Sequence, residues 1–296
     1  MSLIITGPAY GIRWINVKHL FDVTANLNAA SDVSVSKDHR IYVVDGANNK
    51  IRIFDKNGNY LSSFGKEGSQ NGEFKFPLGI DIDNSGKVYI ADSGNHRLQI
   101  FNPDGKFIAK IILPSKNNQP ADPSDVAVDE TRNRCYVVDN DNHYILVYDL
   151  SKNKFINTYG SPGSGKLAFR YPFLITLDKD KYLYIVDVIN TRVQVLNPDG
   201  LFVAFIGGWG VEKGEFFRPK GVAIDRNNRV YVSDSYLGVI QIFDSNGEFF
   251  AVVGDPAKKA PKKFKTPMGL FIDNNNRLYV VEMLANRVSV YHIETK

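Results

Sequence analysis

The chain has 296 residues, of which 43% are hydrophobic and 23% charged, so it contains enough apolar side chains for a sizeable folded core. Its net charge of +4 comes from 36 basic and 32 acidic residues, an excess too small to indicate nucleic-acid binding by itself. A single cysteine excludes an intrachain disulfide and a cysteine-cluster metal site. No apolar run reaches the roughly 18 residues of a membrane-spanning helix.

The first predicted strand covers residues 12–17 and precedes a series of repeats. Its apolar sequence resembles the fourth strands of those repeats, such as residues 202–206. The last repeat ends after its third strand, residues 287–291, and would otherwise leave an exposed edge that invites aggregation. We therefore expect residues 12–17 to become the outer strand of the last repeat.

The repeats are marked by strand-like runs that end in an acidic residue every 47 or 48 residues. The acidic residues are Asp45, Asp92, Asp139, Asp187, Asp234 and Glu282. In the second repeat, strands are predicted at residues 77–83, 88–92, 97–101 and 107–112, separated by short segments rich in Asn, Asp, Ser and Gly. These segments leave no room for a crossover helix.

Four antiparallel strands in each of six repeats predict an all-β, six-bladed β-propeller whose ring is closed by the N-terminal strand. We interpret residues 1–296 as one domain, with residues 1–28 as closing strand and link. The six repeats cover about residues 29–75, 76–121, 122–170, 171–217, 218–265 and 266–296.

The second repeat also carries Asn95-His96-Arg97-Leu98 after Asp92, across the end of the connection and the start of the third strand. This motif is similar to the Asn-His-Leu signature of the NHL-repeat family, and the resemblance extends over about residues 29–293. Variants of the motif are Asn190-Thr191-Arg192-Val193 and Asn286-Arg287-Val288. Many members of that family are sensor ectodomains or modules that bind RNA or protein. A minority are lyases, and similar propellers include streptogramin lyases and metal-dependent lactonases.

The resemblance also bears on location. Free-standing bacterial NHL propellers often resemble secreted or periplasmic proteins. We therefore expect a bacterial protein that is exported, with its signal absent from this sequence, and we expect a monomer.

The connections indicate which face binds. In a propeller, the links between blades and the connections from second to third strand emerge on one face. The links at residues 65–76, 160–171, 207–218 and 254–266 are long, and long loops on a rigid scaffold commonly carry binding sites. Binding is therefore predicted on this long-loop face.

The repeated acidic residue is predicted to be architectural, because it recurs in every unit. It can bond backbone amides or pair with the basic residue five positions later. That residue is Lys50, Arg97, Arg192 or Arg287 in four repeats, and Tyr144 or Val239 in the third and fifth. These two breaks mark where the ring loses its symmetry.

A second break concerns the position near the start of each first strand, which we expect at the channel mouth. It is occupied by Gly79, Gly221 and Gly269, or by Asp32, Asp125 and Leu174. With Asp81, these aspartates offer oxygen ligands that Ca²⁺ or Mg²⁺ prefers, and Asp32 and Asp125 are the candidate metal ligands. The alternative is that each aspartate caps backbone amides of a loop.

The last link is rich in lysine. A basic rim with Trp209, Phe216 and Phe217 nearby could bind RNA or another anionic polymer. The alternative is that mobile lysines serve solubility. The basic residues are Lys258, Lys259, Lys262, Lys263 and Lys265, with Lys213, Arg218 and Lys220 in the neighbouring segment.

No catalytic residues are predicted. Cys135 occupies an apolar strand position, and no histidine falls at an inward channel position. The sequence therefore predicts no nucleophile–base pair and no channel histidine triad of the amidating-lyase type.

We therefore expect a scaffold that binds a protein or peptide partner through its long-loop face, with no required cofactor. The alternative is a divalent-cation-dependent hydrolase or lyase, lactonase-like or streptogramin-lyase-like, with its site at the channel mouth. The candidate ligand-binding residues are Asp32, Asp81, Asp125, Tyr144, Trp209 and Arg218.

Overall fold

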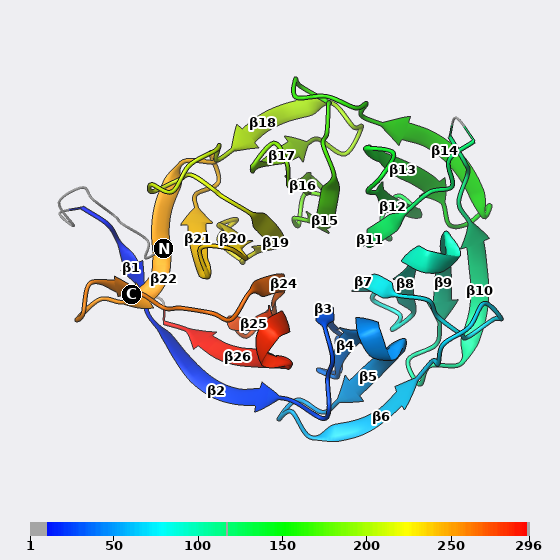
Figure 1. Cartoon of the computed structure of the whole chain (residues 1–296), viewed down its shortest axis with the longest axis horizontal. Helices are drawn as coiled ribbons and strands as arrows, with labels where there is room; N and C mark the ends of the chain where they lie inside the picture. Colours follow the sequence, from blue (N-terminus) through cyan, green and yellow to red (C-terminus); the bar gives the residue numbers. More distant parts are fainter. Residues whose placement is uncertain (1–10, 117, 295–296) are drawn as a thin grey trace.

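The computed structural model describes residues 11–116 and 118–294, whose strands form six sheets around a central axis (Figure 1). Five sheets contain four antiparallel strands, and the sheet of blade five adds two short strands to such a set. The first strand of each blade lies nearest the axis (Figure 1). The predicted all-β, six-bladed propeller is therefore confirmed.

The blades follow one another along the chain. Blade one contains β3 (Ala30–Val35), β4 (Ile41–Asp45), β5 (Lys50–Phe54) and β6 (Tyr60–Phe64). Blade two contains β7 (Pro77–Ile82), β8 (Val88–Asp92), β9 (Arg97–Phe101) and β10 (Phe107–Ile112), and blade three contains β11 (Pro123–Asp129), β12 (Arg134–Asp139), β13 (Tyr144–Asp149) and β14 (Lys154–Tyr159). Blade four contains β15 (Pro172–Leu177), β16 (Leu183–Asp187), β17 (Arg192–Leu196) and β18 (Phe202–Ile206).

Blade five contains β19 (Pro219–Ile224), β20 (Val230–Asp234), β21 (Val239–Phe243) and β22 (Phe249–Asp255), with the short strands β1 (Trp14–Ile15) and β23 (Ala260–Pro261) added to β22. Blade six contains β24 (Pro267–Ile272), β25 (Arg277–Glu282), β26 (Arg287–Ile293) and β2 (Val17–Val23). Short 3-10 turns lie at η1 (Gly46–Asn48), η2 (Ser93–Asn95) and η3 (Met283–Ala285).

The second strands form the centre of the blades. All five residues of β4, β8, β16 and β20 are buried, because neighbouring blades pack against both faces of each sheet. Their sequences are consequently continuous apolar runs, whereas the outer strands β10 and β18 alternate between half-buried and exposed residues. The core is therefore divided among the junctions between blades.

Strand direction assigns the connections to two faces. The first strand of each blade runs away from the inter-blade link, so its far end meets the turn to the second strand. The long-loop face carries the inter-blade links and the second-to-third-strand connections. The opposite, short-turn face carries the turns between the first and second strands and between the third and fourth strands. Among the described residues, no helix has the length and apolar character needed to span a membrane.

The N-terminal segment closes the ring, but not through the predicted residues. Strand β2 pairs antiparallel with β26, from Val17 opposite Ile293 to Val23 opposite Val288. Residues 12–17 were therefore the wrong choice for the closing strand. Trp14 and Ile15 instead extend blade five in parallel with β22, and Ile15 packs in the core between blades five and six. The two strands together join the last two blades.

Deleting residues 11–23 should destabilise the whole ring, because it exposes the edge of β26 and removes Val23, which is fully buried. We expect a lower and broader melting transition by circular dichroism. The control is Lys18→Ala, an exposed position of the same strand, which should melt like the parent. A deletion variant with the parent's Tm would show that the ring does not depend on this closure.

Candidate functional site

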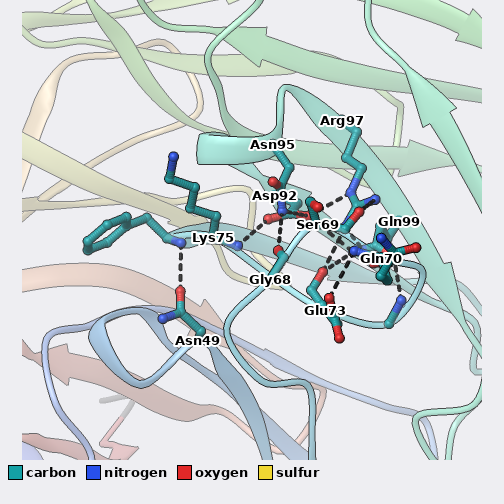
Figure 2. Close-up of polar contacts among 12 residues, drawn as sticks. Asn49, Gly68, Ser69, Gln70, Glu73, Lys75, Asp92, Asn95, Arg97 and Gln99 are labelled. Carbon is teal, nitrogen blue, oxygen red and sulfur yellow. Dashed lines mark hydrogen bonds and ion pairs between the residues drawn. The ribbon is translucent and has the colours of Figure 1, made fainter.

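The acidic residues that end the second strands hold the long loops against the blades. We call these the strand-end carboxylates; they are Asp45, Asp92, Asp139, Asp187, Asp234 and Glu282, and all are buried. Figure 2 shows the arrangement at Asp92, whose Oδ1 accepts the amide of Lys75 at 2.8 Å. Its Oδ2 accepts from Arg97 Nε at 2.7 Å and from Asn95 Nδ2 at 2.9 Å. Asp92 therefore accepts hydrogen bonds both from the backbone of the link and from side chains of its own blade.

Arg97 extends this network into the loop. Its two terminal nitrogens donate to the carbonyls of Ser69, Gln70 and Glu73 at 2.8–2.9 Å (Figure 2). A buried ion pair with so many hydrogen bonds is satisfied rather than available for a ligand. The predicted architectural role of the strand-end carboxylate is therefore what the structure shows in this blade.

The predicted cationic partner is correct in three blades and wrong in one. Arg97, Arg192 and Arg287 pair with the carboxylates five residues before them. Asp45 pairs with Arg52 instead of Lys50. Side chains two residues apart on a strand lie on the same face of the sheet. A residue seven positions after the acidic residue, such as Arg52, can therefore reach the carboxylate just as a residue five positions after it can.

The third blade lacks the cation. Asn142 donates to both oxygens of Asp139, at 3.0 and 3.1 Å, and burial raises the pKa of this carboxyl. Tyr144 lies at the start of β13, half-buried, with Lys116 Nζ 3.4 Å from the centroid of its ring. The structure therefore places Tyr144 on the long-loop side, where its ring is already in contact with a lysine.

The fifth blade uses its strand-end carboxylate differently. Asp234 Oδ2 accepts the amides of Phe217 and Arg218 at 2.7 and 2.9 Å. Its Oδ1 accepts the amides of Tyr236 and Leu237 at 3.1 and 2.9 Å. With Val239 in place of the cation, four backbone amides donate hydrogen bonds to this buried carboxylate, and Lys263 interacts with it electrostatically. One carboxylate thus fixes two separate loop segments.

These two segments present adjacent aromatic side chains. The rings of Phe217 and Tyr236 have centroids 4.3 Å apart and an interplanar angle of 31°. Tyr236 is 53% exposed, and Phe217 is also exposed. Phe216 was grouped with Trp209 and Phe217 in the sequence, but it is fully buried and cannot contact a ligand.

Two further exposed aromatic residues lie on the same face. Trp209 is 76% exposed, while its backbone forms a bridge with Phe216, one residue before Phe217. Tyr171 precedes β15, and its amide donates to His143 Nδ1 at 3.1 Å. We call Trp209, Phe217, Tyr236 and Tyr171 the aromatic rim. Sequence reasoning missed Tyr171 and Tyr236, although the break at Val239 pointed to this blade.

The lysine-rich link is partly engaged within the protein. Lys258 pairs with Asp255, Lys263 Nζ donates to the carbonyl of Leu237 at 2.9 Å, and Lys262 Nζ lies 4.7 Å from the centroid of the Tyr291 ring. Burial lowers the pKa of Lys263. RNA binding by the set Lys258, Lys259, Lys262, Lys263 and Lys265 stays a prediction.

The three channel aspartates do not lie on the long-loop face. Asp32, Asp81 and Asp125 line a cavity on the axis whose other lining residues include Glu130 and Lys181 near the turns of the short-turn face. Each accepts an amide of the next blade, from Ile80, Val128 and Ile175 respectively. These amides belong to the first strands of the neighbouring blades and not to a loop, so the alternative, capping of loop amides, does not describe these contacts. Cation binding by Asp32 and Asp125 stays a prediction.

Gly79 and Gly269, two of the three glycines at the equivalent position, make room for Asp125 and Asp32. A Cβ on Gly79 would lie 2.3 Å from Asp125 Oδ1, and a Cβ on Gly269 would lie 2.2 Å from Asp32 Oδ1. Alternation of glycine and aspartate thus reflects close packing between neighbouring blades. Within the described residues, no group of three or more Asp, Glu, His or Cys side chains could hold a metal ion.

Comparison with known proteins supports the architecture. A family model described as a 6-bladed beta-propeller matches residues 25–119 and 84–184. The chain belongs to this 6-bladed β-propeller family. No curated protein sequence matches it significantly.

Several solved structures share the fold. A catalytically inactive variant of virginiamycin B lyase from Staphylococcus aureus, crystallised with quinupristin, has a TM-score of 0.65 at 18% identity, covering 91% of this chain and 83% of the lyase. A streptogramin B lyase has a TM-score of 0.68 at 11% identity, covering 97% of this chain and 100% of the other. A protein of unknown function from Bacteroides thetaiotaomicron has a TM-score of 0.68 at 17% identity, covering 94% and 73%. At these identities the similarity concerns the fold alone.

Gly79→Ala should destabilise the protein by about 1–3 kcal/mol, because the new methyl group meets Asp125 Cα at 2.5 Å and Ser124 O at 2.7 Å. Denaturant unfolding measures the effect. Gly165→Ala is the matched control, since a Cβ there has no heavy atom within 4 Å. Equal stability of the two variants would contradict the close packing at the axis.

The axial carboxyls should make stability depend on pH. Burial raises the pKa of Asp32 to about 8, well above the ordinary aspartate value of about 4. Between these values the native state binds more protons than the unfolded state, so this contribution to stability is present at low pH and lost as pH rises towards 8.

Asp32→Asn should therefore gain stability relative to the parent as the pH is raised from about 5 to about 8, because the variant has no proton to lose. Denaturant unfolding at several pH values measures the difference. Asp141→Asn, at an exposed position, should follow the parent throughout. Parallel curves for the parent and Asp32→Asn would contradict the assignment.

Proposed function

We propose that this propeller is a binding module that holds a protein or peptide partner on its long-loop face, with the aromatic rim as the main contact. The observation that carries this proposal is the pair formed by Phe217 and Tyr236, exposed to solvent while their amides are fixed on the buried Asp234. Exposed aromatic side chains on an ordered backbone lose little conformational entropy on binding, and aromatic residues are enriched at protein interfaces.

The surroundings of the rim indicate the chemistry of the partner. Exposed arginines adjoin two rim residues in the sequence, Arg170 before Tyr171 and Arg218 after Phe217. Arginine binds carboxylates through paired hydrogen bonds. The partner that fits best is an apolar or aromatic segment flanked by acidic residues.

We also propose that the repeats are of the NHL type. Supporting this, each residue of Asn95-His96-Arg97-Leu98 has a distinct role. Asn95 bonds Asp92 and the carbonyl of Gly68, and His96 has the left-handed φ of 56° that ends the turn η2. Arg97 pairs with Asp92, and Leu98 is fully buried. Asn190 repeats both contacts in blade four, with Asp187 and Gly163.

The described residues support a cation-dependent hydrolase or lyase less well. The lyases named above share only the fold at 11–18% identity. The aspartates on which that alternative depended, Asp32, Asp81 and Asp125, lie inside the ring and bond backbone amides. Export and the monomeric state stay predictions.

Selection from a random peptide library on the immobilised protein would test the proposal. We expect enriched peptides that combine apolar and acidic residues. Their affinity should fall about tenfold or more in Phe217→Ala and Tyr236→Ala, because centrally placed aromatic residues dominate such interfaces.

Tyr60→Ala is the matched control. Tyr60 is 49% exposed, close to the value for Tyr236, but it lies on the outer strand of blade one. Peptides that bind all variants and the parent equally would contradict the proposed site. Peptides that lose affinity in Tyr60→Ala instead would place binding on the outer edge of the ring.

A further inference from the structure

The first strands bring one residue of each blade close to the axis on the long-loop face. Each first strand begins at this face, so the second residues of these strands surround the axis there, around the centre of Figure 1. We call these six residues the inner ring. They are Ser31, Leu78, Ser124, Phe173, Lys220 and Met268. Lys220 of blade five is the charged member of this ring.

Contacts between neighbouring blades hold the inner ring together. The hydroxyls of Ser31 and Ser124 donate to the backbone carbonyls of Leu78 and Phe173, at 2.6 and 2.7 Å. Lys220 Nζ lies 4.2 Å from the centroid of the Phe173 ring. Phe173 packs against the core of its own blade and against a core cluster that contains residues of blade six. The Lys220 ammonium group therefore lies beside an aromatic ring near the axis.

The ammonium group of Lys220 has no anionic partner in the protein. Lys220 is half-buried, and within the described residues its Nζ forms neither a hydrogen bond nor an ion pair. Burial lowers the pKa of Lys220, and the neighbouring positive charge of Arg218 lowers it further. The Nζ atom is not fully enclosed, so a ligand can reach it. An ammonium group has three donors, and an anion bound here would supply both an acceptor and the opposite charge.

Arg218 offers a second set of donors beside Lys220. Its amide donates to Asp234 at 2.9 Å, and its carbonyl accepts the amide and the hydroxyl of Ser235 at 2.9 and 3.1 Å. The Arg218 side chain is exposed, and its guanidinium group has no hydrogen bond or ion pair in the part of the chain that the structure describes. A guanidinium group binds a carboxylate through paired hydrogen bonds. The fixed backbone therefore presents an unpaired guanidinium next to an unpaired ammonium.

The acidic residue near this ring does not neutralise the two cations. Asp122 occupies in blade three the position that Arg218 occupies in blade five, and its carboxylate accepts the hydroxyl of Ser93. Arg218 is the one charged neighbour that shifts the pKa of Lys220 among the described residues. Blade five therefore carries a local excess of positive charge on this face.

We propose that Lys220 and Arg218 together bind a carboxylate of the peptide partner, and that an apolar side chain next to this carboxylate packs on Tyr171 and Phe173. The inference rests on the function proposed above and names the anchor of the partner. A single-stranded nucleic acid fits less well, because it requires a basic groove along its backbone. The position equivalent to Arg218 is occupied by Asp122 in blade three and by Thr266 in blade six.

Three blocked dipeptides test the proposal in calorimetric titrations near neutral pH. N-acetyl-glutamyl-phenylalanine amide carries a side-chain carboxylate, N-acetyl-glutaminyl-phenylalanine carries a terminal carboxylate, and N-acetyl-glutaminyl-phenylalanine amide carries none. We expect saturable binding of a carboxylate probe, and at least about tenfold weaker binding of the neutral probe, which cannot pair with the two cations. The tighter of the two carboxylate probes identifies the source of the carboxylate, an acidic side chain or a chain end.

Lys220→Met and Arg218→Gln are the decisive variants. Each removes a charge and keeps a side chain of similar length, so the fold is expected to remain, and a thermal melt verifies this. Each should lose at least about tenfold in affinity for the carboxylate probes. Lys75→Met is the matched control, because it removes a positive charge from an exposed position of the same face, and it should bind like the parent.

Four outcomes would overturn the proposal. They are absence of saturable binding of both carboxylate probes, equal binding of the neutral probe, unchanged affinity in the folded Lys220→Met variant, and an equal loss in Lys75→Met. Tighter binding of an oligouridylate of about twelve nucleotides, lost in the same two variants, would also overturn it by assigning the cations to phosphate.

Failure of this inference can be distinguished from failure of the proposed function. Peptides selected on the protein that lose affinity in Phe217→Ala and Tyr236→Ala but not in Lys220→Met would contradict the carboxylate anchor and leave the aromatic rim as the binding site. Carboxylate probes that require Lys220, combined with selected peptides that ignore Phe217 and Tyr236, would contradict the role of the rim instead.

Discussion

The long-loop face of this protein depends on the hydrogen bonds of the strand-end carboxylates. Each is buried where the second strand of a blade meets the long-loop face, and each satisfies backbone amides of the link before its own blade. Without these bonds the links would be long irregular segments with many backbone groups to satisfy. With them, loops of about a dozen residues become ordered parts of a rigid ring.

The same constraint explains why the blades are not equivalent on this face. Where an arginine pairs with the carboxylate, as at Asp92, the guanidinium group also donates hydrogen bonds to backbone carbonyls of the loop. In blade five the cation is replaced by Val239, and Asp234 binds four amides from two segments. The carboxylate is then held by backbone amides, and the side chains of those segments, Phe217 and Tyr236, are exposed to solvent. A small change in sequence thereby converts a contact within one loop into a support for two exposed aromatic side chains.

Much of this could be read from the sequence, because propeller blades repeat and the 47- or 48-residue period fixes strand order, blade number and the faces of the loops. Details that depend on contacts between blades could not be predicted from the sequence. The closing strand is Val17–Val23 rather than residues 12–17, since both segments are apolar and only pairing with β26 decides between them. Arg52 replaces Lys50 because both lie on one face of β5. The position of Asp32 and Asp125 along the axis likewise depends on how neighbouring first strands pack. Gly79 and Gly269 at the equivalent position indicated a close approach between blades, but the sequence did not show how deep in the ring it lies.

The central claim is that Asp234 orders the two segments that carry the exposed aromatic pair, and amide hydrogen exchange of Asp234→Ala against the parent tests it most directly. The amides of Phe217, Arg218, Tyr236 and Leu237 should exchange at least about tenfold faster in the variant, because each loses its acceptor, while the Lys75 amide held by Asp92 should keep its rate. Unchanged exchange at Phe217 and Tyr236, or the same acceleration at Lys75, would contradict the account.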